Sequence, residues 1–320
     1  MPEKVALVVN PRSAGGRTAR SIRTMAPGLQ HHVGPHTVLE THAPGHATDL
    51  VRQALHDGCT RIISAGGDGT HYEVINGFFE NGAAINPDAV LALLPSGTGS
   101  DLARGLRIPK GRAALPTLMQ TETITADVGQ FTYTTFAGDA RTAYFLNTCH
   151  IGIGGEVAVQ VGAASKRFGG FIAFLSGILR ALVKYTDQPM HIDIDGRIFE
   201  QPIKGIVVSK AEYDGGGIHI APHARFDNGL FEVYVIGPVS FFDALRSLPK
   251  LYQGRLEERP DIVKYFRCKR LAVETTGTAK VSPHGEVAGV LPATFEVLPG
   301  ALRVVGNLSK EMKDELDGHG

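Results

Sequence analysis

The chain has 320 residues, of which 43% are hydrophobic and 20% charged, and its 32 basic residues balance its 32 acidic ones. The zero net charge excludes recruitment of nucleic acid by a global positive field, and the length favours two packed units. The three cysteines are widely separated and lack metal-ligand spacing, so we expect reduced thiols in a cytoplasmic protein. An apolar strand is expected from residue 5, directly after the first four residues, so we expect no signal peptide.

Three apolar strands in the first hundred residues each end in a loop of small polar residues. The strands and their loops are 5–9 with 10–16, 62–65 with 66–70, and 91–94 with 95–101. Parallel strands of this kind meet at their carboxyl ends, where open α/β sheets bind ligands. Glycines let backbone N–H groups approach a ligand, and a helix N-terminus behind them attracts anions. The three loops therefore predict a cradle for a polyphosphate.

The loop Gly66-Gly67-Asp68-Gly69-Thr70 is the most informative of the three. A carboxylate would repel phosphate, so we expect Asp68 to face the Mg²⁺ ion that accompanies a nucleotide, through water. Neither the Walker pattern nor the dinucleotide fingerprint is present. A single glycine cluster of this kind is also compatible with a plain turn between a strand and a helix.

The alternation of strands and helices stops near residue 127. Before it, a strand over 37–41 precedes an amphipathic helix over 47–55, which predicts a doubly wound α/β domain. After it, frequent strands joined by short turns predict an antiparallel sandwich or barrel. The Asp195-Gly196 pair predicts a hairpin. The expected strands are 130–136, 142–147, 190–194, 198–203, 205–209, 231–236 and 272–274.

Residues 166–184 are apolar with basic flanks. The segment is too short to cross a bilayer, and Arg180 interrupts it. One interpretation is a helix that covers the edge of the β domain, with Arg180 and Lys184 in water. The other is an interfacial helix whose phenylalanines face lipid while its first cations meet lipid phosphates. The residues of this second interpretation are Phe168, Phe171, Phe174, Lys166 and Arg167.

These motifs, in this order, resemble the diacylglycerol kinase catalytic superfamily, in particular its bacterial lipid kinases and the sphingosine and ceramide kinases. The likeness continues through 145–147, 215–222, 227–230, 285–286 and 295–304. It implies an N-terminal nucleotide-binding domain like that of NAD kinases and phosphofructokinases, followed by an antiparallel β domain. Because the last strand returns to the first domain in this family, the expected domains are 1–126 plus 297–320, and 127–296.

The resemblance implies ATP with Mg²⁺ as the phosphate donor and a hydroxyl of a membrane lipid, diacylglycerol or a sphingoid-type alcohol, as the acceptor. Phosphoryl transfer needs a phosphate cradle, a divalent cation and a base near the acceptor hydroxyl. Thr41 is almost as well explained as an ordinary hydroxyl at a strand end. The residues implied to hold the nucleotide are Asn10, Thr41, Gly66, Gly67, Asp68, Gly69, Thr70, Ser96, Gly97 and Thr98, with Asp68 also in the metal network.

The candidate base is where the chain departs from the family. The family has Asp-Gly-Glu where this chain has His284-Gly285-Glu286, and that aspartate is the usual base. A neutral imidazole accepts a proton near physiological pH, so we expect His284 to be the base, with Glu286 as its electrostatic neighbour. If His284 is inert, Asp68 or Glu286 takes the role.

Two further departures concern polar residues near glycines. Some relatives hold a structural Mg²⁺ ion near an Asp-Asp-Gly motif, which is Asp227-Asn228-Gly229 here. One carboxylate fewer weakens binding of a hard cation, which argues against a second metal site. Ser100 stands where the family usually has asparagine, and we expect it to cap the following helix.

We therefore expect an ATP-dependent lipid kinase of phospholipid metabolism that visits the cytoplasmic membrane surface and has no nucleic-acid partner, with a homodimer left open. One alternative is an NAD-kinase-like enzyme that phosphorylates a soluble hydroxyl compound, which the long second-half resemblance disfavours. The other is a nucleotide-binding regulatory protein with weak or no turnover, which His284 and Asn228 would explain.

Overall fold

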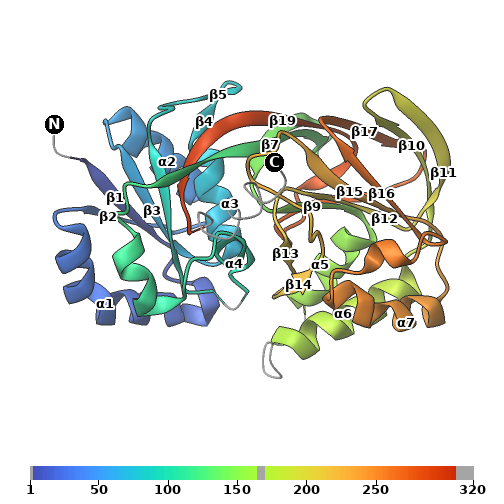
Figure 1. Ribbon diagram of the computed structural model, residues 1–320, viewed down its shortest axis with the longest axis horizontal. Coiled ribbons are helices and arrows are strands. Elements are labelled where there is room, and N and C mark those ends of the chain that lie inside the picture. Colours follow the sequence, from blue (N-terminus) through green and yellow to red (C-terminus); the bar gives the residue numbers. More distant parts are fainter. Residues whose placement is uncertain (1–2, 98, 164–169, 308–320) are drawn as a thin grey trace, which may run out of the picture. The chain divides into compact units, whose positions relative to one another are not determined.

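The computed structural model describes residues 3–97, 99–163 and 170–307, with side chains described except over 161–163 and 170–175 (Figure 1). It divides into two compact units. Unit 1 contains the chain up to Ala126 and the segment that begins at Gly300, and unit 2 is Asp127–Pro299. The predicted fold class, an α/β domain combined with an antiparallel β domain, is confirmed.

Unit 1 is built on a parallel sheet with the strand order β6-β3-β1-β2 and the end of β19 beside β6. Strands β1, β3 and β6 are buried along their whole length, which explains their continuous apolar sequences. The bounds are β1 Val5–Val9, β2 Thr37–Glu40, β3 Arg61–Gly66, β6 Val90–Pro95 and β19 Gly289–Val305.

Helices of unit 1 follow the strands. The helix expected over 47–55 is α2, which buries Ala47, Val51 and Leu55 at helical spacing. A small antiparallel hairpin, β4 Phe79–Glu80 with β5 Ala83–Ala84, follows α3. The other elements are η1 Ser13–Gly16, α1 Arg17–Val33, α2 His46–His56, α3 Asp68–Gly77, α4 Asp101–Gly105 and η2 Gly111–Thr117.

Unit 2 contains antiparallel strands, and the expected ones are found with small shifts at their ends, except that the strand expected from residue 130 begins at Thr123, within unit 1. The predicted hairpin is confirmed, because Ile194 lies opposite Arg197 and the two turn residues have φ of 48° and 84°. The bounds are β7 Thr123–Thr134, β8 Ala140–Phe145, β9 Thr148–Gly152, β10 Gln188–Ile194, β11 Arg197–Ile203, β12 Gly205–Ser209, β13 Tyr213–Asp214, β14 Ile218–His219, β15 Phe231–Ile236, β16 Val263–Cys268, β17 Arg270–Thr275 and β18 Lys280–Pro283.

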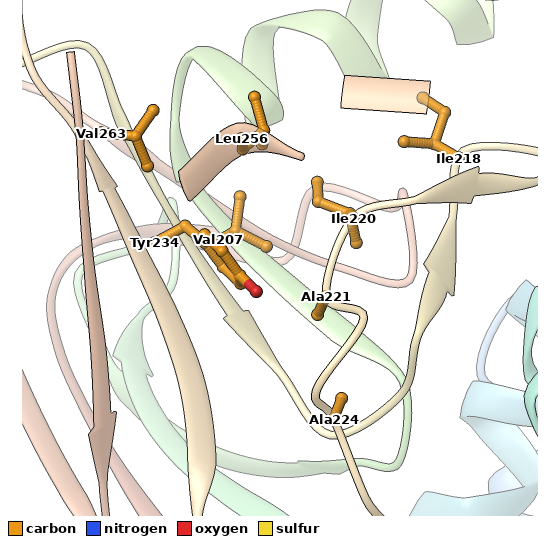
Figure 2. Close-up of a cluster of buried hydrophobic side chains, with 8 residues drawn as sticks. All are labelled: Val207, Ile218, Ile220, Ala221, Ala224, Tyr234, Leu256 and Val263. Carbon is orange, nitrogen blue, oxygen red and sulfur yellow. The ribbon is translucent and has the colours of Figure 1, made fainter. Parts of the chain in front are cut away.

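Strand β19 belongs to both units. It pairs with β17 as far as Glu296 in unit 2 and with β6 at Arg303 in unit 1. Aromatic stacking fixes its unit 2 half, since the rings of Phe131 and Phe295 are stacked at 5.7 Å. A second core joins β12, β15 and β16 to the segment that follows β14 (Figure 2). Its buried residues are Val207, Ile218, Ile220, Ala221, Ala224, Tyr234, Leu256 and Val263.

The helices of unit 2 lie together on one side of its strands (Figure 1). They are α5 Ile153–Ala163, α6 Gly170–Lys184, α7 Phe241–Tyr252 and the short η4 Leu256–Glu258. Helix α6 contains most of the apolar segment singled out in the sequence, whereas Lys166, Arg167 and Phe168 lie outside the described residues. In the described part of the chain, no helix combines the length and the apolar character that crossing a bilayer requires.

Candidate active site

The three predicted loops begin side by side at one edge of the unit 1 sheet. In the parallel register, Val9 lies opposite Ala65, and Gly66 lies opposite Pro95. The Asn10 N–H donates to the Ala65 carbonyl at 3.3 Å, and the Ser96 N–H donates to the Gly66 carbonyl at 2.9 Å. The structure therefore brings together the nucleotide residues predicted from the first and second loops with Ser96 and Gly97 of the third, while Thr98 lies outside the described residues.

Two of these loops touch backbone to backbone. A methyl group on Gly97 would lie 2.5 Å from the Cα atom of Gly67, and a methyl group on Gly66 would lie 2.5 Å from the side chain of Thr70. Any larger residue would push the loops apart. The glycines are therefore required by packing, and the contact is reinforced by the Gly97 N–H, which donates to the Gly66 carbonyl at 3.1 Å.

Hydroxyl and amide side chains join the loops to each other. The Asn10 side-chain amide donates to Thr70 Oγ1 at 3.2 Å, and Ser96 Oγ lies 2.9 Å from Thr18 Oγ1. Thr41 is nearly buried, and its N–H donates to the Val9 carbonyl at 2.9 Å, which places it at the same sheet edge. Among the described residues, no side chain caps the N-terminus of α3, which begins after Gly67, so the partial positive charge of the helix faces this polar group of loops.

Asp68 has a structural partner that the sequence did not reveal. Its Oδ1 atom accepts a hydrogen bond from the Leu102 N–H at 3.2 Å, at the start of α4. Ser100 occupies the N-cap position as expected, but its side chain does not cap the helix, because its φ is 57° and its hydroxyl donates to the Gly97 carbonyl. A left-handed backbone turns the serine side chain away from the helix start, and Asp68 supplies the cap.

The oxygen atoms of this edge suit a magnesium ion. Asp68 is partly exposed, and the hydroxyls of Thr70 and Ser96 come from the adjoining loops. Carboxylate and hydroxyl oxygens, completed by water and phosphate, are the donors that Mg²⁺ prefers. Across the described ranges, no group of three or more His, Cys, Asp or Glu side chains is placed to hold a metal without a nucleotide.

His71 lies one turn into α3, directly behind the glycine loop. It is completely buried, and its Nδ1 atom lies 2.8 Å from Ser64 Oγ of β3. Burial lowers the pKa of His71 to about 4, although the nearby Asp68 carboxylate acts in the opposite direction. His71 is therefore neutral at physiological pH and links the helix to the sheet.

In unit 2, His284 and Gly285 form the tight turn between β18 and β19. Their φ angles are 49° and 77°, and the Glu286 N–H donates to the Pro283 carbonyl at 2.9 Å. Histidine, like aspartate and asparagine, tolerates positive φ better than most residues, so it fits the place of the family's aspartate. The His284 N–H donates to the Thr148 carbonyl at 2.9 Å, which fixes the turn to β9. His284 is buried and Glu286 is exposed.

A half-buried histidine–aspartate pair lies beside this turn, and it is not predicted from the sequence. His150 Nε2 lies 2.7 Å from Asp214 Oδ2, and in the strand register His150 lies opposite Ser282. Burial would raise the pKa of Asp214, but His150 and the hydrogen bonds to Asp214 outweigh it and hold that pKa below its usual range. The two residues are 64 positions apart, so no local motif could have indicated the pair.

Comparison with known proteins shows which family the chain belongs to. Residues 4–131 match the diacylglycerol kinase catalytic domain, and residues 147–306 match the YegS C-terminal NAD kinase beta sandwich-like domain. The chain is 27% identical over 282 residues to a diacylglycerol kinase of Bacillus subtilis (strain 168), covering 87% of this chain and 88% of that protein. It is 29% identical over 304 residues to a YegS-like lipid kinase of Pseudomonas aeruginosa, covering 94% of each.

A solved structure agrees with this match at the level of the fold. The crystal structure of a diacylglycerol kinase from Bacillus anthracis str. Sterne has a TM-score of 0.70 at 22% identity, covering 96% of this chain and 98% of that one. The two matched domains together account for nearly all of the described residues. The chain therefore belongs to the diacylglycerol kinase superfamily of lipid kinases, and it carries a C-terminal domain of the YegS type.

Proposed function

We propose that this protein transfers the γ-phosphate of ATP to a hydroxyl group of a membrane lipid, diacylglycerol or a sphingoid-type alcohol. The observation that carries the proposal is the packing of Gly67 against Gly97 at the carboxyl edge of the unit 1 sheet. This contact holds the third loop beside the start of α3, where the N-cap residue Gly67 provides no side-chain cap for the first N–H groups of the helix. This arrangement suits the phosphate tail of a nucleotide.

Each proposed nucleotide residue has a definite task. Backbone N–H groups at the start of α3, within 67–70, bind phosphate oxygens. The N–H groups of Ser96 and Gly97 donate to the Gly66 carbonyl, so the third loop supports the second, and Asn10 and Thr41 support the loops from the neighbouring strands. Asp68, with the hydroxyls of Thr70 and Ser96, holds the Mg²⁺ ion. Mg²⁺ bound with the nucleotide neutralises the negative charge that spreads over the transferred phosphoryl group.

His284 is proposed as the base that accepts the proton of the lipid hydroxyl. The hydrogen bond from the His284 N–H to the Thr148 carbonyl fixes the backbone of its turn to β9, and general base catalysis requires a base at a fixed position. Glu286 stabilises the imidazolium that forms. Glu286 or Asp68 is the alternative base if His284 only shapes the turn.

To phosphorylate a membrane lipid, the protein must contact a membrane surface. In the described part of the chain, α7 is the best candidate for the element that makes this contact. Phe241, Phe242 and Leu245 share one face of this helix and are 37%, 71% and 42% exposed. Arg246 beside them is also exposed. Apolar side chains with an adjacent cation are typical of helices that bind at an anionic lipid interface. Helix α6, which packs against α7, adds the exposed Val183.

The experiment is to incubate the protein with ATP labelled in its γ-phosphate and a total lipid extract. Label that becomes soluble in chloroform supports the proposed lipid kinase. Label in a new water-soluble product indicates an NAD-kinase-like acceptor. No transfer, with ATP still bound, indicates a nucleotide-binding regulatory protein.

A further inference from the structure

The ammonium group of Lys210 is completely buried in unit 2 and is surrounded by oxygen atoms. Its Nζ atom lies 3.1 Å from Asp127 Oδ2, 3.1 Å from Asn228 Oδ1 and 2.8 Å from the Leu230 carbonyl oxygen. An ammonium has three N–H donors, and each of them has one oxygen partner here. All three N–H donors of the charged Lys210 side chain therefore form hydrogen bonds.

The same oxygens also organise the chain around Lys210. The Gly229 N–H donates to Asp127 Oδ2 at 2.6 Å, and the Leu230 N–H donates to Asn228 Oδ1 at 3.2 Å. The Asp127 N–H donates to the Phe226 carbonyl at 2.6 Å. Segment 226–230 is thus held against β7 by hydrogen bonds that surround the positively charged ammonium group of Lys210.

A carboxylate, a side-chain amide oxygen and a main-chain carbonyl are the ligand types that bind a divalent cation such as Mg²⁺. Here a lysine ammonium already occupies their centre, and a divalent ion beside it would be repelled. The neighbouring acidic side chains form hydrogen bonds with other residues. Asp227 accepts from Arg225 at 3.3 Å, and the buried Glu232 accepts from Tyr265 and Arg267.

We propose that Lys210 is an internal cation that replaces a structural divalent metal ion at the contact between β7 and segment 226–230, so that this site takes no metal. Burial lowers the pKa of Lys210, and the paired Asp127 carboxylate opposes that shift. The oxygens that a divalent ion would need are therefore committed to the Lys210 side chain. Any Mg²⁺ requirement of this protein comes from its nucleotide alone.

The first experiment uses the full chain without nucleotide. Thermal unfolding is followed in chelator and in excess Mg²⁺, and Mn²⁺ binding is followed by electron paramagnetic resonance. We expect the unfolding midpoint to be the same in both buffers within about 1 °C, because no site links the metal to folding. A saturable rise in the midpoint with Mg²⁺, or a tightly bound Mn²⁺ ion, would overturn the proposal.

The second experiment tests Lys210 itself. Lys210→Met leaves the Asp127 carboxylate buried without its cation, so we expect the midpoint to fall by roughly 10 °C. Lys269→Met, at an exposed lysine of the same unit, should leave it unchanged. In Lys210→Met combined with Asn228→Asp, Mg²⁺ should restore part of the loss. A Lys210→Met midpoint equal to that of the natural protein would contradict the proposal.

If Lys210→Met does not fold, Asn228→Asp alone still gives an answer. It places a second carboxylate against the retained ammonium, so we expect a midpoint at least as high as that of the natural protein and still independent of Mg²⁺. A midpoint that rises with Mg²⁺ in this variant would show that the ammonium does not exclude the metal. These readouts do not depend on kinase activity, so their failure is distinct from failure of the proposed function.

Discussion

The carboxylate of Asp68 accepts the N–H of Leu102 at 3.2 Å, so one side chain links the loop after β3 to the start of α4. Asp68→Asn keeps an acceptor for this N–H but removes the charge, whereas Asp68→Ala removes both. We expect Asp68→Asn to fold normally and to lose MgATP binding and turnover. Asp68→Ala should lose about 1 kcal/mol of unfolding free energy in addition. Denaturant unfolding and nucleotide titration separate the two effects, and an active Asp68→Asn variant would rule out the metal role.

Gly97 tests the proposed nucleotide cradle. In Gly97→Ala the new methyl group clashes with Gly67, so the two loops must separate. We expect at least a tenfold loss of nucleotide affinity, measured by calorimetry, because the loop at Gly67 and the start of α3 would be displaced. Gly237→Ala is the control, since a methyl group there would meet only ordinary contact at 3.5 Å. Unchanged affinity in Gly97→Ala would show that these loops do not bind the phosphates.

His284 is tested with residues that tolerate its positive φ. His284→Asn keeps the turn but cannot accept a proton, so we expect lipid phosphorylation to fall about 100-fold or more. His284→Asp should retain activity, with the acid limb of the pH profile moved to lower pH, because a carboxylate titrates below an imidazole. His284→Ala or His284→Asn with most of the natural turnover would mean that another residue is the base.

His71 should make the fold sensitive to acid. Its pKa is about 4 when folded and about 6.5 when unfolded, so between these values the unfolded chain binds the extra proton. The contribution of neutral His71 to the unfolding free energy is fully present above about pH 6.5. It is lost as the pH falls toward 4, by about 3 kcal/mol in total. We expect His71→Asn to show a shallower fall in unfolding free energy over this range. If the unfolding free energy of His71→Asn and that of the natural protein fell equally with pH, His71 would not be the cause of the acid sensitivity.

The α7 surface predicts binding to anionic lipid vesicles at low salt. Phe242→Ser with Leu245→Ser should lower the bound fraction in co-sedimentation at least about tenfold, because two apolar anchors are lost. Phe136→Ser, at an equally exposed phenylalanine elsewhere in unit 2, should have little effect. Absence of binding by the natural protein would count against membrane contact through this surface.

Much of the fold could be predicted because the sequence patterns that indicate strands and turns involve only neighbouring residues. Buried parallel strands have continuous apolar sequences, and the hairpin at Asp195-Gly196 follows from two residues that accept positive φ. Helix α5 was missed because its sequence is rich in glycine and valine, which favour helix poorly, so packing decides its conformation.

The sequence by itself determined the order of strands and glycine loops, and with it the family and the place where phosphate chemistry is expected. Only the tertiary structure decided which polar side chains pair with one another. It pairs Asp68 with Leu102, His150 with Asp214, and Lys210 with Asp127 across 34, 64 and 83 positions. Strand periodicity and turn chemistry act over a few neighbouring residues, whereas these contacts form when distant segments are buried together and must satisfy each other's charges and hydrogen bonds.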